Sequence, residues 1–565
     1  MKRNKNTGTP KKNKETGTSI FLGPVQAWFS RVVGCPTNIQ SLSWPRIAAG
    51  ESVLLLAPTG SGKTLAAFLA CLDRIWRSTP PSHPGVRILY ISPLKALNQD
   101  IRRNLSIPLS GVLEEAEARG TSLRPIRVGV RTGDTTAEQR RALNRNPPEI
   151  LITTPESLHL LLTSEGRENL RQVETVILDE IHSLCPNKRG AFLSLLMERL
   201  ESLRLGLPGK PLESVAPLQR IGLSATQKPL DEVARFLVGL ENAPGKSNHL
   251  RNRPVTILDA GSQKSLDVQI TWPQPEGVPG NGRPESIWPG IHEHTKDLVL
   301  AHHSTIVFAN NRRSAEKITA GINDDPAKPL ALAHHGSISL EKRLAIEESL
   351  KAGALKAVIA TSSLEMGIDM GPVNLVVQVE SPGSVASAIQ RIGRAGHLVG
   401  QVSKGRILPK TEMDLAECAA LIPMVIRGEV EPLLVPTNPL DILAQQIVSA
   451  VAMDCWPARQ LFECFRRAYP YHQLTPEVFD ETLAMVSGRF LQLGHQPPAE
   501  VGPNDKELKA GPRVLAALQP KIHHDRSLGV LEALPGTKAN AIAGGGAIPD
   551  TGNYAVIGPE GTRVG

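Results

Sequence analysis

Short apolar runs alternate with amphipathic helical stretches over the first 240 residues of the chain. Apolar runs that are bounded by turn residues predict buried strands, and their alternation with helices predicts a parallel sheet covered on both faces. Strands of this first series are expected at 53–57, 87–92, 126–130, 149–153, 174–180 and 220–225. A second series follows at 305–310, 330–335, 356–361 and 374–380. We therefore expect an α/β protein with two parallel-sheet domains in tandem.

The composition and rhythm of the chain change between and after these two series. Residues 240–288 are rich in Gly, Pro and Asn, which predicts the joint between the domains. After residue 428, helical patterns at 441–453, 461–469 and 475–488 precede a strand-like run at 489–493. This order is typical of a winged helix, although a plain helical packing domain fits the same pattern.

From residue 518 onward, short strand-like runs with Gly-rich turns predict the start of a β-rich domain. No partner strands follow, so we expect the chain to end part-way through that domain. The expected segments are a basic flexible tail at 1–18, the first α/β domain at 19–245, the second at 246–430, a winged-helix domain at 431–515 and the incomplete β-rich domain at 516–565.

Composition narrows the class of protein. In 565 residues, 63 Lys and Arg stand against 55 Asp and Glu, and the resulting charge of +8 suits a polyanionic partner. The six cysteines are scattered without a C-x-x-C pair, which disfavours zinc and iron–sulfur sites and is typical of reduced thiols in the cytoplasm. No apolar run approaches the ~20 residues of a membrane span, so no membrane partner is expected. The sequence does not specify an oligomeric state.

The segment APTGSGKT at 57–64 stands directly after a predicted strand and directly before a predicted helix. In that context it predicts a phosphate-binding loop, because its glycines allow backbone N–H groups to turn toward phosphate oxygens. Lys63 would reach the β- and γ-phosphates of ATP, and the Thr64 hydroxyl would ligate Mg²⁺. The residues expected to bind nucleotide in this loop are Pro58, Thr59, Gly60, Ser61, Gly62, Lys63 and Thr64.

Two adjacent carboxylates, Asp179 and Glu180, follow the apolar strand at 174–178. Beside a phosphate loop, Asp179 would hold Mg²⁺ and Glu180 would orient and deprotonate the water that attacks the γ-phosphate. An acidic pair after a strand is by itself compatible with ordinary surface charge. Its combination with the phosphate loop favours the catalytic interpretation.

These two motifs together resemble those of superfamily 2 DExH-box helicases, and the family's other motifs follow in the expected order. The matching segments are SPLKAL at 92–97, RTGD at 131–134, TTPES at 153–157, SAT at 224–226, FANNR at 308–312, HHGS at 334–337, ATSSLEMGID at 360–369 and QRIGRAGH at 390–397.

Finer details resemble the large helicase-related (Lhr) family. They are PTNIQ at 36–40 with Trp44-Pro45, KRGA at 188–191, NPLD at 438–441, RRAYPY at 466–471 and IPDTG at 548–552 with Tyr554. The resemblance covers nearly everything after the tail. Members of that family continue well beyond residue 565, through the β-rich domain, so the chain looks truncated at its C-terminus.

The resemblance implies two RecA-like domains, with ATP and Mg²⁺ bound between them, followed by the winged helix. Gln40 would recognise adenine, and Gly367 and Asp369 would lie at the ribose and the domain interface. Arg391 and Arg394 would act as arginine fingers on the γ-phosphate. The residues that would couple hydrolysis to movement are His182, Ser224 and Thr226.

The remaining motifs would bind the phosphates of a nucleic-acid strand without reading its bases. The residues expected in this role are Pro93, Lys95, Arg131, Gly133, Thr154, Pro155, Asn310, Arg312, Gly336, Ser337, Thr361 and Ser362. The family further implies stimulation by single-stranded DNA, 3′-to-5′ movement, unwinding of DNA duplexes or RNA–DNA hybrids, and a role in DNA repair. Two alternatives stay open: an RNA helicase with the same chemistry, and a nucleic-acid-binding module whose motor is idle.

Overall fold

The structure is a computed structural model of the 565-residue chain. It describes residues 18–58, 60–79, 83–93, 95–209, 215–225, 227–243, 249–261, 265–273, 286–325, 327–365, 371–396, 401–489 and 519–546. The basic tail before residue 18, the expected strand beyond Arg489 and everything after residue 546 lie outside the described residues.

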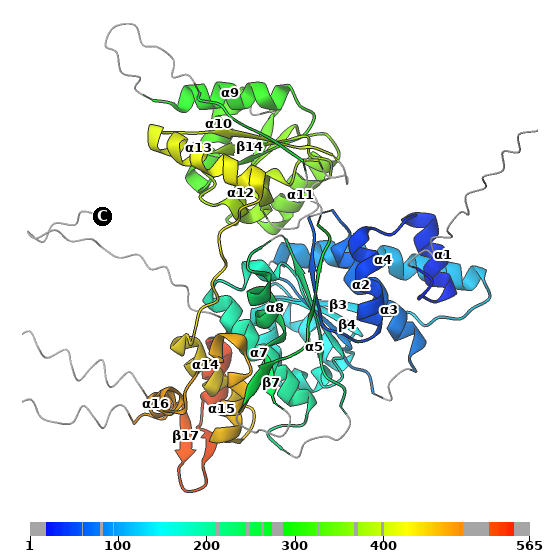
Figure 1. The fold of residues 1–565 in the computed structure, drawn as a ribbon, viewed down its shortest axis with the longest axis vertical. Coiled ribbons are helices and arrows are strands. Elements are labelled where there is room, and N and C mark those ends of the chain that lie inside the picture. The colour runs from blue at the N-terminus through cyan, green and yellow to red at the C-terminus, as the bar shows by residue number, and fades with distance from the viewer. Residues whose placement is uncertain are drawn as a thin grey trace, which may run out of the picture.

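The first domain, which lies in the lower half of Figure 1, is built on a seven-stranded, wholly parallel sheet with the order β3-β4-β2-β5-β6-β1-β9. Its strands are β1 Val53–Leu56, β2 Ile88–Ile91, β3 Val128–Arg131, β4 Ile150–Thr153, β5 Thr175–Leu178, β6 Gln219–Ser224 and β9 Thr256–Asp259. The last strand lies past the boundary expected at 245. A hairpin of β7 Leu240–Asn242 and β8 Leu250–Asn252 turns the chain back, so that β9 pairs with the edge of β1.

Two helical layers cover this sheet. Val53 and Leu55 pack into the core under α1 Gly23–Val32, α2 Asn38–Ala48, α3 Lys63–Arg77 and α4 Lys95–Ala118. Leu54 and Leu56 pack on the other face, under α6 Pro155–Leu162, α7 Lys188–Arg204 and α8 Leu230–Val238. The short helix α5 Ala137–Arg145 links β3 and β4. Because both faces are buried, the strands read as continuous apolar runs in the sequence.

The second domain repeats this plan with six parallel strands in the order β10-β15-β14-β11-β13-β12. They are β10 Leu266–Ile270, β11 Thr305–Phe308, β12 Ala331–His334, β13 Ala357–Ala360, β14 Leu375–Val379 and β15 Ser403–Leu408. The helices are α9 Trp288–Leu300, α10 Arg312–Ile322, α11 Leu340–Lys351, α12 Val385–Ile392 and α13 Glu412–Arg427. The expected pair of RecA-like domains is confirmed.

The segment after α13 forms the expected winged-helix domain. Its helices are α14 Leu440–Val451, α15 Ala458–Arg466 and α16 Pro476–Val486. A three-stranded antiparallel sheet joins β16 Trp456–Pro457 to the hairpin of β17 Ile522–Asp525 and β18 Val530–Ala533, and α19 Thr537–Ala543 follows. The boundary expected at 515 therefore runs through this small sheet, because Trp456 pairs with Leu531.

The winged helix packs against the first domain, beside α7 and away from the second domain (Figure 1). One continuous apolar core contains Leu193 and Leu196 of α7, Leu443 of α14 and Phe465 of α15. The connection from α13 is held on the first domain as well, since the Leu433 N–H donates to the Lys228 carbonyl at 2.8 Å.

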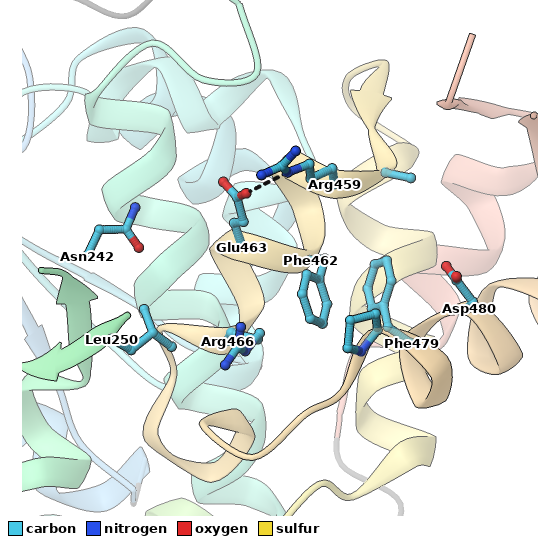
Figure 2. Close-up of a pocket in the computed structure, with 10 residues that line it drawn as sticks. Asn242, Leu250, Arg459, Phe462, Glu463, Arg466, Phe479 and Asp480 are labelled. Carbon is cyan, nitrogen blue, oxygen red and sulfur yellow. Dashed lines mark hydrogen bonds and ion pairs between the residues drawn. The ribbon is translucent and has the colours of Figure 1, made fainter. Parts of the chain in front are cut away.

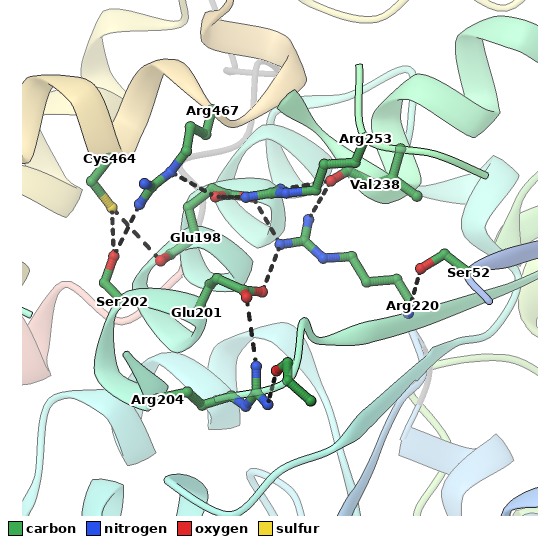
Figure 3. Close-up of polar contacts among 11 residues, drawn as sticks. Ser52, Glu198, Glu201, Ser202, Arg204, Arg220, Val238, Arg253, Cys464 and Arg467 are labelled. Atoms are coloured by element: carbon green, nitrogen blue, oxygen red, sulfur yellow. Dashed lines mark hydrogen bonds and ion pairs between the residues drawn. The ribbon is translucent and has the colours of Figure 1, made fainter. Parts of the chain in front are cut away.

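A buried ion cluster reinforces this contact (Figure 3). The Glu198 carboxylate, with a fully buried side chain, accepts from Arg220 at 2.9 Å and from both terminal nitrogens of Arg253 at 2.6 and 2.8 Å. Arg467, which follows α15, lies 3.3 Å from the same carboxylate. The cluster thus joins α7, β6 and the β8–β9 connection to the winged helix.

Within the described part of the chain, every helix is too short or too polar to cross a membrane.

Candidate active site and nucleic-acid interface

The phosphate loop lies between β1 and α3, as the sequence predicts. Gly60 and Gly62 have backbone φ angles of +80° and +81°, which residues other than glycine rarely adopt. Gly62 caps the N-terminus of α3. The Lys63 ammonium donates to the carbonyl oxygens of Ala57 and, at 3.2 Å, Pro58. A positive charge and a helix N-terminus therefore lie side by side, which is the arrangement that binds phosphate.

Gln40 lies against this loop from the first turn of α2. Its side-chain oxygen accepts from the Thr37 N–H at 2.9 Å, and its amide nitrogen donates to the Gly62 carbonyl at 3.4 Å. The Thr37 hydroxyl donates to the Ser61 carbonyl at 3.0 Å. These contacts tie the start of α2 to the phosphate loop, so a ligand that touches Gln40 also changes the surroundings of Gly62.

We expect Gly62→Ala to weaken ATP binding by at least about tenfold. The added Cβ would lie 2.6 Å from the Gln40 amide nitrogen, and the backbone would remain at φ +81°. Gly50→Ala is the matched control, because Gly50 has the same φ and open space around its Cα. A non-glycine residue at such a φ costs roughly 1–2 kcal/mol, so calorimetric titration with ATP should separate the variants whereas unfolding should not. Equal ATP affinity in both variants would contradict this role for the Gln40–Gly62 contact.

The acidic pair follows β5 and is buried beneath the phosphate loop. Tyr90 of β2 donates its hydroxyl to one Asp179 oxygen, and the Glu180 N–H donates to the other at 2.8 Å. Burial and the neighbouring Glu180 charge raise the pKa of Asp179. Burial lowers the pKa of Lys63, although the charges of Glu180 and Asp179 oppose that shift. A cation placed among these oxygens would favour the ionised carboxylates.

Tyr90 was not expected in the site from the sequence. The signal was a hydroxyl-bearing residue within the otherwise apolar strand Ile88–Ile91, one position before its end. In a parallel sheet, β2 and β5 are neighbours with aligned carboxyl ends, which brings the hydroxyl to Asp179.

His182 connects the acidic pair to both domains. Its Nδ1 accepts from the Ala225 N–H at 3.3 Å and lies 3.3 Å from the Ser224 hydroxyl oxygen. Its Nε2 lies 3.6 Å from a Glu180 oxygen and 3.0 Å from the side-chain amide of Gln390 in the second domain. Burial lowers the pKa of His182, so the ring is neutral. Nδ1 thus accepts from the first domain, while Nε2 faces the side-chain amide nitrogen of Gln390 in the second domain.

The phosphate loop and the acidic pair line a cavity of about 460 Å³, which residues of α1 and α4 also line and to which the second domain contributes Arg394. The predicted site residues that line it are Pro58, Gly60, Ser61, Gly62, Lys63, Thr64, Asp179, Glu180 and Arg394. Of the two arginines expected as fingers, only Arg394 lines the cavity. Arg391 is held inside the second domain by Glu365, Asn310 and Gln378.

The donor set of the cavity fits Mg²⁺. Thr64 and Asp179 both line it, and their hydroxyl and carboxylate are oxygen ligands of the kind that Mg²⁺ takes together with substrate phosphates and water. Among the residues that the structure describes, no cluster of three or more His, Cys, Asp or Glu side chains could hold a metal ion.

The residues expected to contact nucleic acid lie at the carboxyl ends of the strands in both sheets. In the first domain Pro93, Arg131, Thr154 and Pro155 are buried and Gly133 is exposed. Arg131 donates to the Asn144 side chain at 3.1 Å, and burial lowers its pKa to about 10. In the second domain the exposed members are Asn310, Arg312, Gly336, Ser337 and Ser362, and Thr361 is half-buried. Of the residues predicted to bind the nucleic-acid strand, those of the second domain are therefore more exposed to solvent than those of the first.

Some predicted residues cannot be placed. Thr59, Thr226, Gly367 and Asp369 lie outside the described residues, and for Lys95 only the backbone at the start of α4 is described.

A second cavity, of about 560 Å³, lies between the β7–β8 hairpin, α15 and α16 (Figure 2). Phe462 and Phe479 contact each other at a ring separation of 5.3 Å, and the Arg466 guanidinium lies 5.3 Å from the Phe462 ring. None of the predicted site residues that the structure describes is among those lining it.

Three family patterns match the chain in sequence. The DEAD/DEAH box helicase pattern matches residues 37–234, and the helicase conserved C-terminal domain matches 292–398. The winged helix domain of large helicase-related proteins matches 424–494.

Curated relatives agree with these matches. The Lhr helicase/probable uracil glycosylase of Mycolicibacterium smegmatis is 43% identical over 95% of this chain and 35% of its own length. The ATP-dependent helicase Lhr-Core of Methanothermobacter thermautotrophicus is 40% identical over 84% of this chain and 54% of its own length. The chain thus spans about a third of the first protein and about half of the second.

Among solved structures, that of the Mycobacterium smegmatis helicase Lhr bound to ssDNA and AMP-PNP superposes with a TM-score of 0.80 at 44% identity. The match covers 95% of this chain and 63% of that one. Two parallel-sheet domains, the intact phosphate loop and DExH pair, and the family's own winged helix all point the same way. The chain belongs to the superfamily 2 DExH-box helicases, in the large helicase-related (Lhr) family.

Proposed function

We propose that the chain is an ATP-dependent helicase and translocase that moves on single-stranded DNA. The observation that carries this proposal is the cavity in which the phosphate loop and acidic pair of one domain meet Arg394 of the other. The solved relative bound to ssDNA and AMP-PNP supports ATP and single-stranded DNA as the ligands.

The phosphate loop, the acidic pair and Arg394 each have a chemical role in this proposal. Lys63 and the loop N–H groups bind the phosphates, and Glu180 orients the attacking water and accepts its proton. Arg394 stabilises charge on the transferred phosphoryl group. Asp179 and Thr64 hold Mg²⁺, which supplies positive charge against the phosphate oxygens when it is bound.

Domain movement would connect this chemistry to the strand. Closure brings Arg394 to the phosphates, and the neutral His182 senses closure through the Gln390 amide. Backbone groups and hydroxyls at the strand ends hold DNA phosphates without reading bases, so the same grip works at every step. In line with the family, we propose 3′-to-5′ movement, unwinding of DNA duplexes or RNA–DNA hybrids, and a role in DNA repair in the cytoplasm.

Steady-state ATP hydrolysis, with and without single-stranded DNA or RNA, tests this function. We expect single-stranded DNA to raise turnover at least about tenfold, and 3′-tailed duplexes to be unwound in preference to 5′-tailed ones. Stronger stimulation by RNA would favour the RNA helicase. Binding of DNA without any gain in turnover would favour an idle motor that serves as a binding module.

A further inference from the structure

Arg391 and Arg394 lie three residues apart at the end of α12, yet their surroundings differ. Arg394 lines the ATP cavity. The Arg391 side chain is 9% exposed and points back into the second domain, with its guanidinium 5.5 Å from the Phe308 ring. The two arginines of this motif therefore have different surroundings: Arg394 faces the ATP cavity, and Arg391 faces the interior of the second domain.

One side of the Arg391 guanidinium contacts Asn310, a residue predicted to bind nucleic acid. Its Nη1 donates to the Asn310 side-chain oxygen at 3.1 Å and to the Gln378 side-chain oxygen at 2.9 Å. Asn310 in turn donates to the Ser381 carbonyl at 2.7 Å. Asn310 is exposed at the end of β11, so a phosphate bound there would compete with the Ser381 carbonyl for the Asn310 amide N–H groups and would shift the side chain whose oxygen Arg391 contacts.

The other side of Arg391 reaches Glu365. Its Nε and Nη2 donate to one Glu365 carboxylate oxygen at 3.2 and 3.0 Å, while the Glu365 carbonyl accepts from Arg394 Nη2 at 2.7 Å. Glu365 ends the single 3-10 turn η3 Ser362–Leu364, which begins after Thr361. One residue thus contacts both arginines, and a single 3-10 turn separates it from the predicted nucleic-acid contacts Thr361 and Ser362.

We propose that Arg391 is a positioning residue, and that the Arg391–Glu365 pair couples DNA bound at Asn310, Thr361 and Ser362 to the placement of Arg394. This inference rests on the function proposed above. Both partners are largely buried, with 9% and 12% of their side chains exposed, so the pair is held in low dielectric and a shift at either end is transmitted. A finger would touch phosphate directly, whereas Arg391 acts through Glu365.

Glu365→Gln tests the coupling, because it keeps the shape and removes the charge. We expect DNA-stimulated turnover to fall at least tenfold and DNA-free turnover to fall less than threefold. Single-stranded DNA affinity, measured by fluorescence anisotropy, should change less than threefold. Arg391→Lys should lower the same ratio of stimulated to DNA-free turnover. Glu429→Gln is the matched control, since its pair with Arg427 is exposed in the same domain.

Arg394→Lys provides the contrast, because loss of a finger should lower both rates equally. If Arg391→Lys also lowers both rates equally, Arg391 is a finger and the inference is overturned. An unchanged ratio in Glu365→Gln and Arg391→Lys would equally overturn it. If Glu365→Gln unfolds, the turnover ratio of Arg391→Lys alone tests the inference.

The double variant should have the same turnover ratio as each single variant, because both changes break one contact. If the unmodified protein hydrolyses ATP without a response to DNA, the proposed function fails first.

Discussion

Glu180→Gln should reduce DNA-stimulated ATP hydrolysis by at least about 100-fold while changing ATP affinity less than about threefold. A positioned general base contributes roughly 10²–10⁴-fold, and glutamine keeps the shape of glutamate without accepting a proton. Glu180 is suited to this role because it lines the cavity with Lys63 and Arg394 and is 7% exposed. Its backbone φ of +45° holds it in a turn directly after β5.

The measurement is steady-state turnover at saturating DNA, together with nucleotide binding by calorimetry. Glu168→Gln is the control, because Glu168 lies in the same domain with about half of its side chain exposed and should leave turnover unaffected. A Glu180→Gln protein that kept more than a tenth of the original rate would exclude Glu180 as the base.

Glu198→Gln should lower the free energy of unfolding by about 3–5 kcal/mol, the usual cost of breaking a buried ion pair from one side. The change leaves Arg220, Arg253 and Arg467 together without their shared carboxylate. Because the first domain and winged helix share one core and this cluster, they should unfold in a single transition. Urea unfolding of both proteins checks the prediction.

Glu463→Gln is the matched control, because its pair with Arg459 is on the surface of α15 and should contribute no more than about 1 kcal/mol. Equal losses of stability in the two variants would show that the buried cluster adds nothing special. Separate unfolding of the winged helix would contradict the shared core.

The same cluster predicts how stability depends on pH. Burial opposes the ionisation of Glu198, but the charges of Arg253 and Arg220 outweigh it and lower its pKa from 4.5 to about 2. A depressed pKa contributes stability that is complete above pH 4.5 and is lost as the pH falls toward 2, because the unfolded chain takes up the proton first. Glu198→Gln should therefore have a shallower loss of stability over that window.

The predicted strands were found where an apolar run was buried on both faces, as in β1 and β5. β10 and β15 were missed. Their sequences, LDVQI and SKGRIL, mix polar and apolar residues, and β10 is an edge strand that is only half-buried. Such strands carry no continuous apolar signal, so only the pairing of β15 with β14 and β10 reveals them.

The sequence by itself determined the local features of this protein. A strand, a loop with glycines at the required backbone angles and a helix that begins at Lys63 are contiguous, so their chemistry can be read from neighbouring residues. The same holds for Asp179 and Glu180 after β5, and for the family to which the chain belongs.

Only the tertiary structure decided which distant residues meet. It brought Tyr90 to Asp179 and Gln390 to His182, and it paired Trp456 with Leu531. It also gave Arg391 and Arg394, which the motif alone treats alike, different partners. The physical reason is that contacts between residues far apart in sequence depend on how whole sheets and helices pack, whereas a motif records only the residues beside it.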